Sequence, residues 1–378
     1  MSETPREPPR PTTPQRSWRT DVNFSVIVVV VTGLILTWIA TRTADQLDQD
    51  YKNVSSMITL AVGGLLLGGW YWSRSSIRRR WKWLVPVLGL VALIACVRFE
   101  DFTADMRFQL GWRFAARPDQ RLPPAEAEVT RDPQRPLAEG AWDYPRFLGS
   151  DGRATIRNLP LATDWATDPP RLLWRQPIGA GWSAFSVVGD YAVTQEQRGA
   201  YELVVCYELQ SGRIIWSHQD EARFYEVLGG VGPRATPTID GPRVYTQGAT
   251  GILNCLELAS GRRIWKRDII TENSAPQIQW GRSGSPLVVD QMVVVSAGGP
   301  AGKSLVAYDK RSGERIWSGG DDVASYASPV VATLAGQRQV VILNEDQVRG
   351  HRLEDGQPLW SFPWPGNSGA DANTSQPV

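Results

Sequence analysis

The sequence predicts an all-β fold, an incomplete propeller of four-stranded blades, preceded by an α-helical membrane domain with three spans. Two observations predict the propeller: tryptophan recurs at a nearly constant interval, and the same turn phrase comes before it. A third, the confinement of long apolar runs to the start of the chain, predicts the membrane domain. The recurring residues are Trp174, Trp216, Trp265, Trp317 and Trp360. Repeats of about 40–50 residues with several short strands are typical of β-propellers.

A common turn phrase leads to the last four of these tryptophans. Glycine stands four positions before each tryptophan, where it allows the positive φ of a tight turn between antiparallel strands. A small residue stands ten positions before, where we expect it to leave room for the indole. The glycines are Gly212, Gly261, Gly313 and Gly356, and the small residues are Cys206, Cys255, Ala307 and Gly350. Glu208, Glu257 and Asp309 stand eight positions before, and Arg352 replaces the acid in the last repeat.

Each repeat contains four short strand patterns. In one repeat they cover residues 235–239, 243–247, 252–257 and 263–265, with glycine-containing turns between them. An ordinary β-sandwich with incidental tryptophans is the alternative, but a sandwich does not need a fixed distance from glycine to tryptophan.

The phrase of a small residue, an acid and Ser-Gly-x-x-x-Trp resembles the PQQ-type repeat, named after pyrroloquinoline quinone. The resemblance covers residues 142–378. Residues 232–238, 279–287 and 326–330 are most similar to membrane-anchored PQQ-like propeller proteins of bacteria. Such repeats build quinoprotein alcohol dehydrogenases, and also the lipoprotein propeller of the outer-membrane barrel-assembly machinery, which binds no quinone. The resemblance implies the fold and leaves both activities open.

The number of blades is smaller than the resemblance implies. Four complete repeats precede residues 375–378, which resemble the start of a fifth. PQQ-type propellers commonly close with about seven or eight blades. We therefore expect an open arc from a truncated or larger propeller, with a four-bladed ring as the alternative.

Three apolar runs precede the propeller, at residues 24–40, 54–72 and 83–97. With their flanks they approach the ~20 residues of a membrane span, and tryptophans stand at their ends. Nine arginines and lysines lie in the amino-terminal tail and in the second connection. This distribution predicts a cytoplasmic amino terminus and a periplasmic propeller at the bacterial inner membrane. A cleaved signal peptide is the alternative for the first run, but no clear cleavage site follows Leu36.

Two further segments complete the predicted organisation. Residues 1–22 are rich in proline and arginine and are expected to form a disordered cytoplasmic tail. Residues 99–141 are expected to be a juxtamembrane and proline-rich linker. Its first part is either an amphipathic surface segment or a continuation of the third helix.

The sequence contains no recognisable catalytic, cofactor-binding or metal-binding set. His218 and His351 are the only histidines, and neither has a partner at metal-ligand spacing. Cys206 and Cys255 occupy the same position in successive repeats, so we expect two separate core residues rather than a disulfide. A net charge of +1 argues against a nucleic-acid partner.

Two functions remain open, with small-molecule sensing as a third. The first is a protein-interaction module outside the cytoplasm, involved in envelope assembly, which binds a protein or peptide and needs no cofactor. The second is a PQQ-dependent dehydrogenase of alcohols or sugars. For it the resemblance implies two adjacent cysteines against the quinone, a calcium site and a catalytic Asp. No cysteines are adjacent here, and no residues match the calcium ligands or the Asp. We therefore expect a binding protein rather than an enzyme.

Four residues form the candidate binding surface: Trp182, Arg234, Trp280 and Tyr326. They stand at similar places in the loops before the first strand of each blade, which line the channel mouth in propellers. Aromatic side chains and an arginine suit a peptide or an anionic ligand. The alternative is that they plug the channel structurally.

Overall fold

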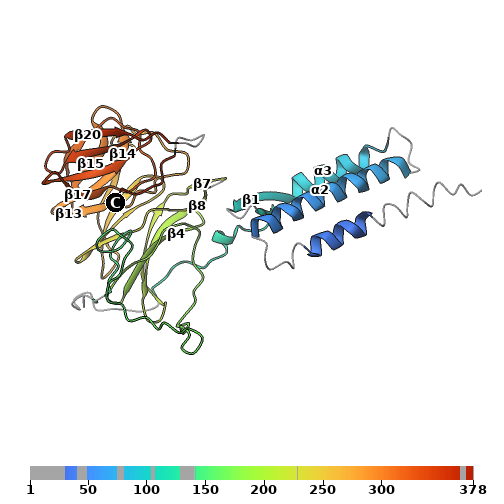
Figure 1. Cartoon of the computed structure of the whole chain (residues 1–378), viewed down its shortest axis with the longest axis horizontal. Coiled ribbons are helices and arrows are strands. Elements are labelled where there is room, and N and C mark those ends of the chain that lie inside the picture. Colours follow the sequence, from blue (N-terminus) through green and yellow to red (C-terminus); the bar gives the residue numbers. More distant parts are fainter. Residues whose placement is uncertain are drawn as a thin grey trace, which may run out of the picture. The chain divides into compact units, whose positions relative to one another are not determined.

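The computed structural model divides the chain into two compact units, Met1–Ala115 and Ala116–Val378. It describes residues 30–40, 49–74, 81–103, 107–127, 140, 142–227, 229–366 and 372–377. Figure 1 shows both units coloured along the chain. The predicted tail, residues 1–22, lies outside the described residues.

The first unit has helices at the three apolar runs. They are residues 30–40, α2 (Gln49–Arg74) and α3 (Leu84–Cys96). Among the helices that the structure describes, none combines the length and hydropathy needed to cross a membrane. The 13 residues of α3 rise about 20 Å, against a hydrocarbon core of ~30 Å. The three predicted spans are therefore not shown by these helices.

A β-hairpin follows α3, where the sequence suggested an amphipathic segment or a longer helix. Strands β1 (Val97–Thr103) and β2 (Arg107–Trp112) pair antiparallel. Arg98 and Glu100 stand two positions apart and form an ion pair of 2.7 Å. Charged and apolar residues alternate here with a period of two, which suits a strand better than a helix.

The described residues of the second unit form four antiparallel sheets of four strands, which confirms the predicted blades. Blade 1 consists of β3 (Ser186–Val188), β4 (Tyr191–Arg198), β5 (Tyr201–Glu208) and β6 (Ile214–Glu221). Blade 2 consists of β9 (Thr238–Asp240), β10 (Arg243–Gln247), β11 (Ile252–Glu257) and β12 (Arg263–Asp268). Blade 3 consists of β13 (Leu287–Val289), β14 (Met292–Gly299), β15 (Lys303–Asp309) and β16 (Arg315–Gly319). Blade 4 consists of β17 (Val330–Leu334), β18 (Gln337–Leu343), β19 (Gln347–Arg352) and β20 (Pro358–Pro363). In Figure 1 they run from green to red, and strand order within each blade follows the chain.

Two short elements lie outside the blade plan. The hairpin of β7 (Tyr225–Glu226) and β8 (Gly230–Val231) is inserted between blades 1 and 2. The 3-10 helix η2 (Pro118–Gln120) belongs to the segment expected to be a linker. Asp119 and Ala125 of this segment are buried, and Asp119 forms a 2.6 Å ion pair with Arg223. Residues 116–127 therefore pack against blade 1.

The repeat phrase acts inside each blade as the sequence predicts. Each small residue is the cross-strand partner of its tryptophan, as Cys206 is of Trp216. The four turn glycines have φ between 70° and 73°. The acids hold the turn: the Ser211 hydroxyl donates to Glu208 at 2.6 Å. In blade 4 a basic residue, Arg352, stands at the acidic position of the phrase. It donates to Asp355 of the turn at 2.9 Å.

The tryptophans of blades 1, 2 and 3 also join each of these blades to the next. The indole Nε1 of Trp216 donates to the Leu258 carbonyl at 2.7 Å, and that of Trp317 donates to Leu353 at 3.0 Å. Trp174, which precedes blade 1 outside any strand, makes the same bond to Leu209 at 2.8 Å. The same contact thus recurs at successive junctions between blades, and each junction has its own cluster of buried apolar side chains.

Residues 372–377 lie beside the start of blade 4. The Gln376 side chain donates to the Ser328 carbonyl at 2.6 Å and accepts from the Ser328 N–H at 3.0 Å. Ser328 makes a matching contact one blade earlier, where its hydroxyl accepts from the Ser285 N–H at 2.9 Å. Gln376 and Ser328 thus take similar places before successive segments, and the start of a further blade stays a prediction.

Candidate functional site

The structure brings the four predicted surface residues together near Gly229, as two contacting pairs. The Trp182 indole Nε1 donates to the Gly229 carbonyl at 2.7 Å, and the Arg234 Nη2 donates to the same oxygen at 2.6 Å. A Cβ placed on Gly229 would lie 3.6 Å from the Cβ of Trp280. The rings of Trp280 and Tyr326 are 5.2 Å apart. We call these four side chains, Trp182, Arg234, Trp280 and Tyr326, the loop cluster.

Bonds between neighbouring loops position the loop cluster. The Trp182 N–H donates to the Pro233 carbonyl at 2.8 Å, and the Trp280 N–H donates to the Tyr326 hydroxyl at 3.3 Å. Arg234 and Tyr326 each stand three residues before a strand-initiating proline, and Ser283 takes that place in blade 3. Trp280 comes three residues earlier, so it joins the cluster without being the repeat equivalent.

Arg234 is the main charge of the loop cluster. Its guanidinium lies 4.6 Å from the centre of the Phe224 ring, a distance suited to a cation–π contact. Burial lowers the pKa of Arg234, whereas the charges of Glu202 and Glu226 raise it. Sequence reasoning missed Phe224 and Gly229, because both belong to the insertion around β7 and β8. Nothing in the repeat pattern marks them.

A pair of carboxylates joins blade 1 to blade 2 beside this cluster. Glu202 and Asp220 face each other across β5 and β6. Burial raises the pKa of Glu202 to about 7, although its carboxylate accepts the Ala249 N–H at 2.9 Å. Burial also opposes ionisation of Asp220, but contacts from His218, Lys266 and Asn254 hold its pKa well below the ordinary value. The two facing carboxyls thus differ in proton affinity, because Glu202 keeps its proton to a higher pH than Asp220 does.

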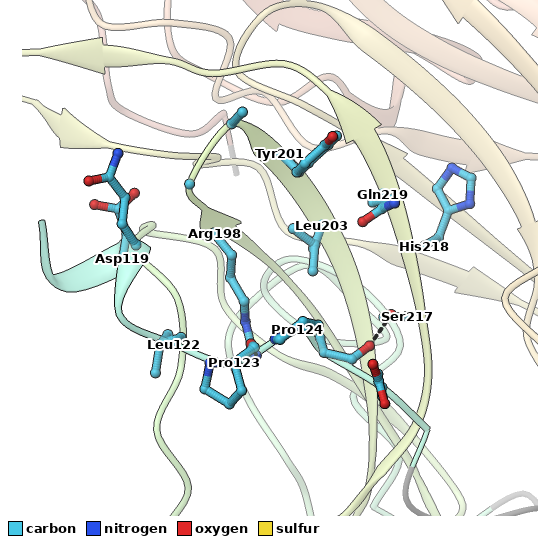
Figure 2. Close-up of a pocket in the computed structure, with 15 residues that line it drawn as sticks. Asp119, Leu122, Pro123, Pro124, Arg198, Tyr201, Leu203, Ser217, His218 and Gln219 are labelled. Carbon is cyan, nitrogen blue, oxygen red and sulfur yellow. Dashed lines mark hydrogen bonds between the residues drawn. The ribbon is translucent and has the colours of Figure 1, made fainter. Parts of the chain in front are cut away.

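A separate cavity of about 700 Å³ lies on blade 1, between residues 119–126 and strands β4 to β6. Figure 2 shows Pro123 and Pro124 on one wall and Tyr201 and Leu203 on the other. The Arg198 Nη1 holds the first wall by donating to the Pro123 carbonyl at 2.7 Å.

Ser217 and His218 both line this cavity, but their geometry does not suit a catalytic pair. The Ser217 hydroxyl donates to the Ala125 carbonyl, as drawn in Figure 2. Successive residues of β6 point to opposite faces, so His218 is not oriented as the base for that hydroxyl. His218 lies instead 3.7 Å from Asp220.

The cysteines and the other histidine occupy structural positions. Cys206 and Cys255 are buried thiols, each paired across the strands with the tryptophan of its own blade, which confirms the predicted core roles. They do not fit the ring of adjacent cysteines that the resemblance implies for the quinone. His351 is fully buried, with Nδ1 2.9 Å from the Gly356 carbonyl oxygen, and burial lowers its pKa. In the described part of the chain, no three His, Cys, Asp or Glu side chains are grouped to hold a metal ion.

Comparison with known proteins agrees with this architecture. The family model described as "Outer membrane protein assembly factor BamB" matches residues 165–279 and 202–378. The chain belongs to this family of PQQ-like β-propellers. The matched ranges together cover all four blades.

Several solved structures are similar to this PQQ-like propeller, among them the following two. Quinohemoprotein alcohol dehydrogenase ADHIIG from Pseudomonas putida HK5 is 14% identical, with a TM-score of 0.40, over 59% of this chain and 40% of that chain. BamB from Moraxella catarrhalis is 18% identical, with a TM-score of 0.29, over 50% of this chain and 65% of that chain. The chain therefore spans less than two thirds of these proteins. A search of curated protein sequences gives no match.

Proposed function

We propose that this PQQ-like propeller is a binding module that recognises a protein or peptide through the loop cluster. The observation that carries the proposal is that side chains from four loops gather near Gly229, with Trp182 and Arg234 both bonded to its carbonyl and Trp280 beside Tyr326. Trp182 is fixed by its hydrogen bond, yet 66% of it is exposed. Aromatic and arginine side chains dominate binding hot spots, and side chains already held in place lose less entropy on binding.

We further propose that the first unit attaches the propeller to the bacterial inner membrane, with the amino terminus cytoplasmic and the propeller periplasmic. In support, α3 is apolar and has no buried residue. Trp81 and Trp83 are exposed at its start, where indoles favour a membrane interface. Large exposed apolar surfaces mark membrane or protein contacts. The description of the family as an outer membrane assembly factor supports a role in envelope assembly.

The alternative is a PQQ-dependent dehydrogenase of alcohols or sugars, with calcium. Its support is that quinohemoprotein alcohol dehydrogenases are among the similar structures. The two buried cysteines lie in separate blades, so they do not form the adjacent pair that this alternative implies.

The binding proposal is tested by photo-crosslinking in living cells. A benzophenone amino acid replaces Val227, which is 44% exposed and lies two residues from Gly229. The matched control replaces Leu334, which is 42% exposed on β17. We expect one discrete adduct from Val227 that is lost in Arg234→Ala, and none from Leu334. Equal labelling at both positions contradicts the proposal.

The alternative is tested on the purified full chain in nanodiscs. We expect that quinone and calcium leave its tryptophan fluorescence unchanged. Saturable quenching, followed by dye reduction when an alcohol is added, would favour the dehydrogenase.

A further inference from the structure

Arg282 is a buried cation beside the loop cluster. It is only 1% exposed. Its Nη2 donates to the Pro276 carbonyl at 2.5 Å, and its backbone N–H donates to Ala249 at 2.9 Å. Its other two side-chain nitrogens, Nε and Nη1, are buried and find no acceptor among the described residues.

Trp280 adds a third unused donor two residues away. Its indole Nε1 is also buried and finds no acceptor in the part of the chain that the structure describes. The Tyr326 ring lies beside Trp280, and its hydroxyl already accepts the Trp280 backbone N–H at 3.3 Å. Three unused donors thus stand on two neighbouring residues of one loop.

The charges around Arg282 differ from those around Arg234. The charges of Glu202 and Glu226 stabilise the Arg234 cation, whereas no carboxylate of the described residues does so for Arg282. Burial lowers the pKa of Arg282 to about 10, so the guanidinium is still protonated at neutral pH. Buried polar groups in proteins are almost always hydrogen-bonded, and an unpaired buried charge is costly. A donor-rich site without an acceptor suits an anionic ligand.

We propose that Arg282 and the Trp280 indole bind a carboxylate group of an acidic peptide, with Arg234 as a neighbouring cation. A carboxylate offers several acceptor sites to N–H donors of this kind, and charge-assisted hydrogen bonds are the stronger ones. The inference rests on the proposed function, because it names the chemical group that the loop cluster recognises. It adds Arg282, which the sequence pattern did not single out.

The test measures peptide binding to the full chain in nanodiscs by calorimetry. The probes are an acetylated, amidated Gly-Glu-Gly-Glu-Gly-Glu peptide and its Gln counterpart. We expect only the acidic peptide to bind. Arg282→Gln should weaken it by about tenfold or more, the usual effect of losing a hydrogen bond to a charged group. Trp280→Phe should weaken it less, and Arg338→Gln, which changes an exposed ion pair with Asp290, should leave it unchanged.

Three results would overturn the inference. The first is equal binding of the two peptides, and the second is acidic-peptide binding that survives both Arg282→Gln and Trp280→Phe. The third is that the protein binds the quinone but not the acidic peptide. The donors would then recognise a carboxylate of the quinone rather than one of a peptide. If Arg282→Gln does not fold, Trp280→Phe and Arg282→Lys carry the comparison. The crosslink from Val227 can persist in Trp280→Phe and Arg282→Lys while the acidic peptide does not bind. That result would support the binding module and contradict only the recognition of a carboxylate.

Discussion

The indole of Trp216 covers Gly261 of the next blade so closely that a Cβ on Gly261 would lie 2.4 Å from its Cε3 atom. The same contact recurs for the other turn glycines. The further pairs are Trp174 with Gly212, Trp265 with Gly313 and Trp317 with Gly356. The glycine is therefore required for two reasons, its positive φ and the missing Cβ. The tryptophan of one blade closes on the turn of the next, so one phrase sets both the turn and the packing of successive blades.

Gly261→Ala separates these two reasons. We expect it to destabilise the propeller by clearly more than the ~1–2 kcal/mol of a left-handed alanine, because the methyl group must displace the Trp216 ring. Gly336→Ala is the matched control, since Gly336 has φ +77° and open space where its Cβ would lie. Denaturant unfolding of both variants, followed by tryptophan fluorescence, measures the difference. Equal losses would show that the ring contact contributes nothing.

Trp265→Ala tests the contact from the tryptophan side. Trp265 is buried and donates to the Lys310 carbonyl of blade 3 at 3.3 Å. We expect a loss of ~3–5 kcal/mol in the free energy of unfolding, as for other buried tryptophan truncations. Trp360→Ala should cost less, because Trp360 is only half-buried and its indole donates within its own blade, to Gln339 at 2.5 Å. If Trp265→Ala lowers the free energy of unfolding by less than ~1 kcal/mol, as substitutions at surface sites do, Trp265 does not stabilise the contact between blades.

Much of the propeller could be predicted from the repeat, because the same turn and strand residues recur in four blades. Turn glycines and small partners such as Cys206 act between neighbouring strands, so sequence spacing reveals them. The closure of Trp216 on Gly261 was not predicted, because it joins separate blades. The proline-rich composition of residues 116–127 predicts a linker. Composition alone does not indicate that Asp119 pairs with Arg223.

The candidate site was predicted in part for the same reason. Arg234 and Tyr326 stand at equivalent repeat positions, so counting from the blade prolines finds them. Phe224 and Gly229 belong to a single insertion and have no counterpart to align. Arg282 looks like an ordinary loop arginine until its burial is known.

The proposed membrane attachment predicts the side on which each segment lies. An alkaline phosphatase fused after Gly140 should be active, because the enzyme folds outside the cytoplasm. A fusion after Ser76 should be inactive, since the nine basic residues of the tail and second connection favour the cytoplasm. Immunoblotting controls for equal amounts of both fusions. The reverse pattern of activity would contradict the orientation, and activity of both would contradict the attachment.

Glu202 predicts how the stability of the propeller depends on pH. Burial raises its pKa from the ordinary 4.5 to about 7, so the folded state holds this proton more tightly than the unfolded state. The resulting stabilisation is complete below about pH 4.5 and is lost as the pH rises through about 7. A difference of this size corresponds to at most about 3 kcal/mol.

Glu202→Gln removes that dependence, because the amide stays neutral and its oxygen can still accept the Ala249 N–H. We expect the variant to match the parent near pH 5 and to exceed it in stability at pH 8. His351 acts in the opposite sense, since its lowered pKa makes stability fall as the pH drops below its ordinary 6.5. The contribution of His351 is the same in variant and parent, so it cancels in the difference between their unfolding free energies at each pH. Denaturant unfolding between pH 5 and 8 measures that difference, with exposed Glu314→Gln as the control. A difference that stays constant with pH would mean that Glu202 is ionised in the folded blade.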